Sequence, residues 1–133
     1  MGTHRLNVLF ADPEADWFSN AAGVLAPHGI HAVQVRTGRE ALRRIEDGDI
    51  HVAVLDQTLP QLSGLQVVKL SREIKAAPPA ILLAKDCTSN LMHEALVMKV
   101  FSVLRKPVDL DLLLETLARV VKRKYEGRWP EVN

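Results

Sequence analysis

Short apolar runs alternate with segments of helical periodicity along most of this 133-residue chain, and this alternation limits its possible folds more than any other feature. Each run has the length of a strand, and each following segment repeats apolar residues every three or four positions. Strictly alternating strands and helices predict an α/β domain with a parallel sheet and helices on both faces. The expected strands are Leu6–Ala11, Ile30–Val35, Val52–Leu55, Ala80–Ala84 and Val100–Leu104.

Capping residues indicate where the five helices begin. Thr37 with Glu40, and Ser63 with Gln66, have the spacing of capping boxes. The expected N-caps are Asp12 (followed by Pro13 at the first helical position), Thr37, Ser63, Thr88 or Ser89, and Asp109.

Polarity separates edge from central strands. His31 and Gln34 interrupt Ile30–Val35, so we expect that strand at an edge of the sheet. Val52–Leu55 and Ala80–Ala84 are apolar throughout, which is typical of strands buried on both faces.

Composition is typical of one globular domain. The chain is 47% apolar and 25% charged, close to the average of folded proteins, and its length fits a single domain. We assign residues 1–125 to that domain and residues 126–133 to a short C-terminal tail.

Charge and cysteine content argue against several other classes of protein and binding site. The net charge of +1 gives no reason to expect direct nucleic-acid or membrane binding, and the basic stretch Lys122–Lys124 suits an exposed helix end. The single cysteine, Cys87, excludes an internal disulfide, and no Cys/His cluster has zinc spacing. Because no apolar run could span a bilayer and no signal peptide is recognisable, we expect a cytoplasmic protein.

Three charged residues follow expected strands directly: Asp12, Asp56 and Lys106. Because the carboxyl ends of parallel strands meet at one edge of a sheet, we expect these side chains to lie together. Two neighbouring carboxylates need a cation, and Mg²⁺ is the natural one for oxygen ligands. Such a pocket would attract a phosphoryl group, and a carboxylate can itself be the nucleophile.

Each of these residues also has an ordinary structural interpretation. Asp12 can be a plain N-cap, Asp56 can start a turn and Lys106 can lie at the surface. Phosphatases of the haloacid dehalogenase type also place an aspartate after a strand, but they expect a second one where Thr58 stands. Flavin binding would need a phosphate-binding loop where Asp12, Pro13 and Glu14 offer negative charge.

Taken together, these motifs resemble the receiver domain of two-component response regulators, over about Leu6 to Lys122. The resemblance rests on Asp12, on Asp56-Gln57-Thr58-Leu59-Pro60 with Gly64, and on Lys106-Pro107. It implies a flavodoxin-like (βα)5 fold with strand order 2-1-3-4-5.

The same resemblance implies roles for the site residues. Asp56 would be the phosphoacceptor, Lys106 would contact the phosphoryl oxygens, and the peptide bond before Pro107 would be cis. Asp12, Asp56 and the backbone carbonyl of Thr58 would hold Mg²⁺.

The resemblance also implies partners. A histidine kinase or phosphotransfer protein would be the phosphodonor, and the protein would not be an enzyme beyond slow self-dephosphorylation. The signal would pass to an effector protein or output domain through the face of the fourth helix, fifth strand and fifth helix, which could also form a homodimer.

Several positions depart from the family pattern. Pro13 replaces a second acid that ligates the metal, Ala84 replaces a hydroxyl residue, Val103 replaces an aromatic, and Lys99 stands where glycine is usual. A hydrogen bond to a charged group contributes about 1.5–3 kcal/mol, whereas a full two-state switch needs roughly 5.5 kcal/mol. We therefore expect weakened Mg²⁺ binding and switching. A phosphorylation-independent interaction module stays open as the alternative function.

Overall fold

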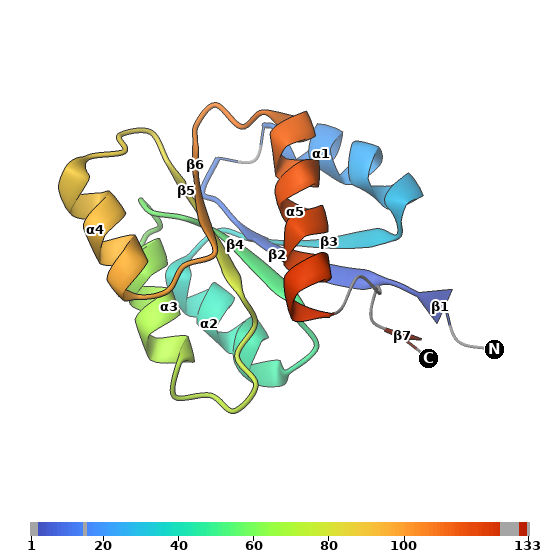
Figure 1. The fold of residues 1–133 in the computed structure, drawn as a ribbon, viewed down its shortest axis with the longest axis horizontal. Helices are drawn as coiled ribbons and strands as arrows, with labels where there is room; N and C mark the ends of the chain where they lie inside the picture. Colours follow the sequence, from blue (N-terminus) through green and yellow to red (C-terminus); the bar gives the residue numbers. More distant parts are fainter. Residues whose placement is uncertain (1–2, 15, 126–130, 133) are drawn as a thin grey trace.

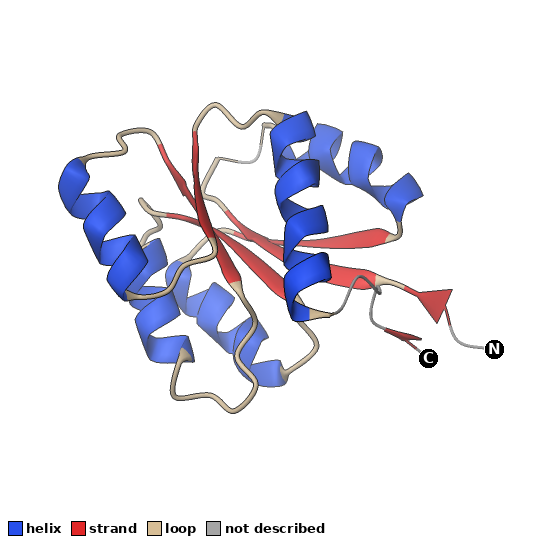
Figure 2. Cartoon of the chain, viewed as in Figure 1, coloured by secondary structure: helices blue, strands red, loops and turns tan. Residues whose placement is uncertain are grey.

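Five parallel strands form one sheet in the computed structural model, which describes residues 3–14, 16–125 and 131–132 (Figures 1 and 2). The strands are β2 (Leu6–Ala11), β3 (Ile30–Val35), β4 (Val52–Asp56), β5 (Ala80–Ala84) and β6 (Ser102–Arg105). They lie in the order β3-β2-β4-β5-β6. Counted along the chain among themselves, these strands have the order 2-1-3-4-5, so the predicted flavodoxin-like fold is confirmed. The edge position predicted for Ile30–Val35 is confirmed as well.

Helices cover both faces of the sheet (Figure 1). They are α1 (Phe18–Leu25), followed by a short 3-10 helix η1 (Ala26–His28), then α2 (Gly38–Asp47), α3 (Gly64–Ser71), α4 (Ser89–Val97) and α5 (Leu110–Lys124). One core layer joins the sheet to α1 and α5, and the other joins it to α2, α3 and α4. Every residue of β4 and β5 is buried, which explains why their sequences are apolar apart from Asp56 at the end of β4.

The predicted N-caps are confirmed at four of the five helices. Thr37, Ser63 and Thr88 each accept a hydrogen bond from a backbone N–H in the first turn, and Ser63 with Gln66 forms a complete capping box. Asp109 accepts from two backbone N–H groups of α5. Each such cap stabilises its helix by about 1 kcal/mol.

The predicted start of the first helix is wrong. Helix α1 begins at Phe18, with Trp17 as its N-cap residue, and Asp12 and Pro13 lie before the helix. The Asp12 carboxylate bonds to Lys106 and to the indole of Trp17, so it is tied into a buried site before the first helical turn begins.

Two other boundaries differ from the prediction. Strand β6 begins at Ser102, because the N–H of Val100 still bonds to the carbonyl of Ala95 at the end of α4. Strand β4 extends one residue beyond the predicted Val52–Leu55 and ends at Asp56.

Lys99, which occupies the usual glycine position, has a φ of 58°. This is the left-handed region, which side chains with a Cβ adopt only at a cost. The residue closes the turn between α4 and β6, where its N–H donates to Leu96.

A two-stranded antiparallel sheet lies apart from the main one. β1 (Thr3–His4) pairs with β7 (Glu131–Val132), which lies inside the stretch expected to be a tail. Residues 126–130 and 133 of that stretch lie outside the described residues. Within the described ranges, no helix has the length and apolar character needed to cross a bilayer.

Candidate functional site

Asp12, Asp56 and Lys106 converge at the carboxyl edge of the sheet. Asp12 follows β2, Asp56 ends β4 and Lys106 follows β6, and these strands lie close together because of the strand order. The Nζ atom of Lys106 is 2.9 Å from Oδ2 of Asp12 and 2.6 Å from Oδ2 of Asp56. All three side chains are nearly inaccessible to solvent, at most 6% exposed. The ammonium group therefore bridges two buried carboxylates.

Asp56 is held by its own turn. Its Oδ1 atom accepts hydrogen bonds from the backbone N–H of Thr58 at 2.8 Å and from the Thr58 hydroxyl at 2.9 Å. Burial acts to raise the pKa of Asp56, but the hydrogen bonds from Lys106 and Thr58 outweigh it and lower the pKa below its ordinary value. Asp56 is thus an ionised carboxylate at neutral pH, as a nucleophile must be.

Gly64 allows that turn to close tightly. A Cβ atom at this position would lie 2.8 Å from the carbonyl oxygen of Asp56 and 2.6 Å from a methyl group of Leu82. A side chain here would push α3 away from the end of β4.

Asp12 accepts three hydrogen bonds. Its Oδ1 atom accepts from the backbone N–H of Glu14 at 2.8 Å, and its Oδ2 atom accepts from the indole Nε1 of Trp17 at 2.7 Å as well as from Lys106. Asp12 is therefore a member of the buried site, and the N-cap interpretation is replaced.

Lys106 is fixed by the end of β6. Its backbone N–H donates to the carbonyl of Ala84 at 2.9 Å, and the Lys106–Pro107 peptide is cis, as the resemblance implied. Burial acts to lower the pKa of Lys106, but the hydrogen bonds and charges of Asp56 and Asp12 outweigh it and raise the pKa. The side chain is consequently protonated at neutral pH.

Three of the four positions that depart from the family pattern lie in β5 and β6 or just after β2, the strands that carry or adjoin the site. Ala84 is buried at the end of β5 and offers no hydroxyl, while Val103 is partly buried in β6. Pro13 follows Asp12 and offers no carboxylate.

The pocket does not offer a ready-made Mg²⁺ site. No group of three or more acidic, histidine or cysteine side chains suited to a metal occurs among residues 3–14, 16–125 and 131–132. Asp12 accepts three hydrogen bonds, and so does Asp56, out of about four that a carboxylate can accept. Mg²⁺ requires near-octahedral oxygen ligands, and while these bonds are kept each carboxylate offers it about one acceptor site.

Sequence reasoning missed two contacts at the mouth of the pocket. One is the indole of Trp17, and the other is an ion pair of 3.2 Å between Lys85 and Glu14, whose side chains are more than half exposed. Such an exposed pair contributes little stability. A hollow of about 480 Å³ beside Lys106 is lined by Glu14, Asp16, Trp17, Lys85, Lys106, Pro107 and Val108.

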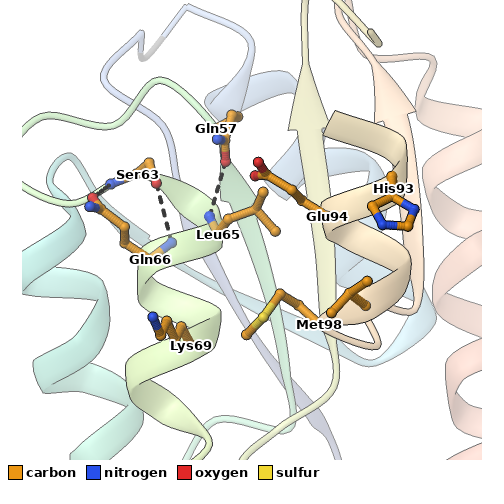
Figure 3. Close-up of a pocket in the computed structure, with 9 residues that line it drawn as sticks. Gln57, Ser63, Leu65, Gln66, Lys69, His93, Glu94 and Met98 are labelled. Atoms are coloured by element: carbon orange, nitrogen blue, oxygen red, sulfur yellow. Dashed lines mark hydrogen bonds between the residues drawn. The ribbon is translucent and has the colours of Figure 1, made fainter. Parts of the chain in front are cut away.

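A second, larger hollow lies between α3 and α4 and does not include Asp56. It measures about 680 Å³, and Figure 3 shows Gln57, Leu65 and Lys69 on one side with His93, Glu94 and Met98 on the other. Gln57 accepts a hydrogen bond from the N–H of Leu65 at 3.0 Å. This groove begins at Gln57, directly after Asp56, and Asp56 does not line it.

The family model of the response regulator receiver domain matches residues 8–118. The chain belongs to this family. This receiver domain is 30% identical over 125 residues to response regulator RR06 of Streptococcus pneumoniae, covering 90% of this chain and 55% of RR06. It is 22% identical over 124 residues to the transcriptional regulatory protein ZraR of Escherichia coli, covering 92% of this chain and 28% of ZraR. The chain thus spans about half, or less, of the length of these curated relatives.

Solved structures agree on the fold of the receiver domain. The signal receiver domain of a putative LuxO repressor protein from Vibrio parahaemolyticus has a TM-score of 0.84 at 24% identity, covering 92% of this chain and 95% of that chain. Chemotaxis response regulator CheY4 of Vibrio cholerae has a TM-score of 0.77 at 25% identity, covering 87% and 98%.

Membership in the family indicates the general function of this domain. Receiver domains are signalling modules of two-component systems that accept phosphoryl groups and are not enzymes in the usual sense. They generally bind Mg²⁺ at an acidic pocket and interact with histidine kinases and output domains. In this chain the acidic pocket is the one that contains Asp12 and Asp56.

Proposed function

We propose that this receiver domain accepts a phosphoryl group on Asp56 and passes a signal to a partner protein. The observation that carries the proposal is the 2.6 Å contact between the carboxylate of Asp56 and the ammonium of Lys106. An ionised carboxylate beside a fixed cation is the pair that phosphoryl transfer requires, because that reaction depends mainly on positioning and charge neutralisation.

The chemistry follows from these two groups. A carboxylate oxygen of Asp56 attacks the phosphorus of a phosphohistidine on a histidine kinase or phosphotransfer protein. The new O–P bond forms an acyl phosphate as the P–N bond breaks, and its electron pair returns to the imidazole nitrogen. Lys106 then pairs with the phosphoryl oxygens, which replaces its contact with Asp56. Slow hydrolysis of the acyl phosphate would reset the domain.

The output face that we propose consists of α4, β6 and α5. Leu96 and Val97 of α4 are 75% and 60% exposed, and Ala95 is the buried residue of this helix. Near α5, the guanidinium groups of Arg119 and Arg123 lie 6.0 and 5.6 Å from the ring centroid of Phe101. Exposed apolar side chains on α4 and cations on α5 are groups that could contact an effector protein, an output domain or a second copy of the chain.

The test is phosphorylation with a small phosphodonor. The wild-type protein is incubated with acetyl phosphate and MgCl₂, and its intact mass is followed. We expect the mass of one phosphoryl group to be added to the wild type and not to Asp56→Asn, which preserves the shape of the side chain. If the wild type gains no mass, or if Asp56→Asn gains the same mass, the phosphoacceptor role is rejected.

The second candidate is an interaction module that works without phosphorylation. The observation that favours it is the chemistry of the pocket, in which both carboxylates already bond to Lys106 while Pro13 and Ala84 supply neither a metal ligand nor a hydroxyl. Under this candidate Asp56→Ala leaves signalling in the cell intact. Loss of signalling in that variant would count against it.

A further inference from the structure

Trp17 makes a contact that the phosphoacceptor chemistry does not need. Its indole N–H donates to Oδ2 of Asp12 at 2.7 Å, which is the same oxygen that accepts from Lys106 at 2.9 Å. Both lone pairs of that oxygen are therefore occupied. Asp12 is 2% exposed, so water does not compete for these bonds.

The indole is held in place by the core. Trp17 packs edge to face against Phe10 of β2, with ring centroids 5.7 Å apart and planes at 81°. Phe10 is 1% exposed and also packs against Phe18. Trp17 thus lies between the apolar core and the buried carboxylate, and its orientation does not depend on surface contacts.

The charges of the pocket show what this contact does. Asp12 and Asp56 carry two negative charges and Lys106 carries one positive charge, which leaves one excess negative charge in a buried site. Neutral donors stabilise that excess: the N–H groups of Glu14 and Trp17 at Asp12, and the N–H and hydroxyl of Thr58 at Asp56. Hydrogen bonds to a carboxylate favour its charged form.

We infer that the indole N–H of Trp17 takes the place of a metal ion at the Asp12 carboxylate. This hydrogen bond stabilises the pocket without a divalent cation and competes with Mg²⁺ for Asp12. Pro13 fits this inference, because the neighbouring position supplies no further carboxylate to draw a cation. Trp17 is thereby a positioning residue that sets metal affinity. The inference stands whether or not Asp56 accepts a phosphoryl group.

The first test compares Mg²⁺ affinity in the wild type and in Trp17→Phe. Phenylalanine keeps an aromatic ring against Phe10 but has no N–H donor. Because a charge-assisted hydrogen bond no longer has to break, we expect Trp17→Phe to bind Mg²⁺ about tenfold more tightly by calorimetry. We also expect MgCl₂ to raise the thermal midpoint of Trp17→Phe more than that of the wild type. Asp12→Asn is the control, and in the Trp17→Phe background it should abolish the gain.

Equal Mg²⁺ affinity in the two proteins, or no measurable binding by either, overturns the inference.

A second measurement does not depend on the stability of Trp17→Phe. In Trp129→Phe, the remaining indole ¹⁵N–¹H signal belongs to Trp17. We expect it to exchange slowly with solvent in metal-free buffer and to shift when Mg²⁺ binds. Fast exchange without metal, or an unchanged signal while backbone amides of the pocket respond to Mg²⁺, contradicts the inference.

Discussion

Lys106 is the residue on which the electrostatics of the pocket depend. It is the cation in contact with both Asp12 and Asp56. Removing one partner of a buried ion pair costs far more than removing an exposed charge, since the remaining charge stays buried without compensation. At this site two carboxylates would be left facing each other.

We predict that Lys106→Met lowers the free energy of unfolding by about 3–5 kcal/mol. Asp56→Asn should cost less, because Lys106 keeps its bond to Asp12 and the repulsion between the carboxylates disappears. The double variant should recover part of the loss, and urea unfolding of all three proteins measures this coupling. Strict additivity would mean that the two side chains do not interact.

Protonation of His51 is a second way in which a single residue affects the stability of the protein. Its Nδ1 atom accepts the N–H of Asn7 at 2.8 Å, which requires the neutral ring. Burial lowers the pKa of His51, Asp49 acts against this, and Arg5 lowers the pKa further. A lowered pKa in the folded state means that the unfolded chain binds a proton first, so stability is full above the unfolded pKa of about 6.5 and falls as pH decreases below it.

We therefore predict that the thermal midpoint decreases between pH 7.5 and pH 5.5. In His51→Gln, whose side-chain oxygen can still accept a hydrogen bond, the decrease should be smaller. Thermal unfolding of both proteins across this range measures the effect. Identical pH profiles would show that another group is responsible.

At the scale of elements, the turn between α4 and β6 carries a conformational cost. Lys99 has a φ of 58°, and a left-handed conformation costs a residue with a Cβ roughly 1–2 kcal/mol. Glycine adopts this conformation without that cost but loses more entropy on folding. The steric gain exceeds the entropic loss at a position like this one.

We predict that Lys99→Gly raises the free energy of unfolding by about 1 kcal/mol. Lys99→Ala is the matched control, because it removes the same charge and keeps a Cβ, and it should give no such gain. Urea unfolding distinguishes the two. A gain of equal size in Lys99→Ala would assign the effect to charge.

The elements also show how much of the fold could be predicted. Apolar runs located all five strands because burial of β4 and β5 on both faces leaves an unbroken signal in the sequence. Capping residues located the starts of α2 to α5, because each cap bonds to backbone groups in the first turn of its own helix. The predicted start of α1 was wrong because the Asp12 carboxylate bonds to the distant Lys106 and to the side chain of Trp17 rather than to the first turn of the helix.

At the scale of the whole molecule, strand order brings the site together. The spacing of apolar residues carries no information about strand order. The predicted order came from the resemblance of the motifs to a family. With the order known, the convergence of Asp12, Asp56 and Lys106 follows from topology. The Trp17 contact could not be predicted, because an aromatic residue beside a strand end carries no sequence signal for its hydrogen-bond partner.

The acyl phosphate itself is the most direct test of the phosphoacceptor role of Asp56. After incubation with acetyl phosphate and MgCl₂, borohydride reduces an aspartyl phosphate to homoserine, and peptide mass spectrometry locates the change. We predict homoserine at position 56 in the wild type, and none in a sample without phosphodonor. Homoserine at another aspartate, or at none, would contradict the assignment of Asp56 as the phosphoacceptor.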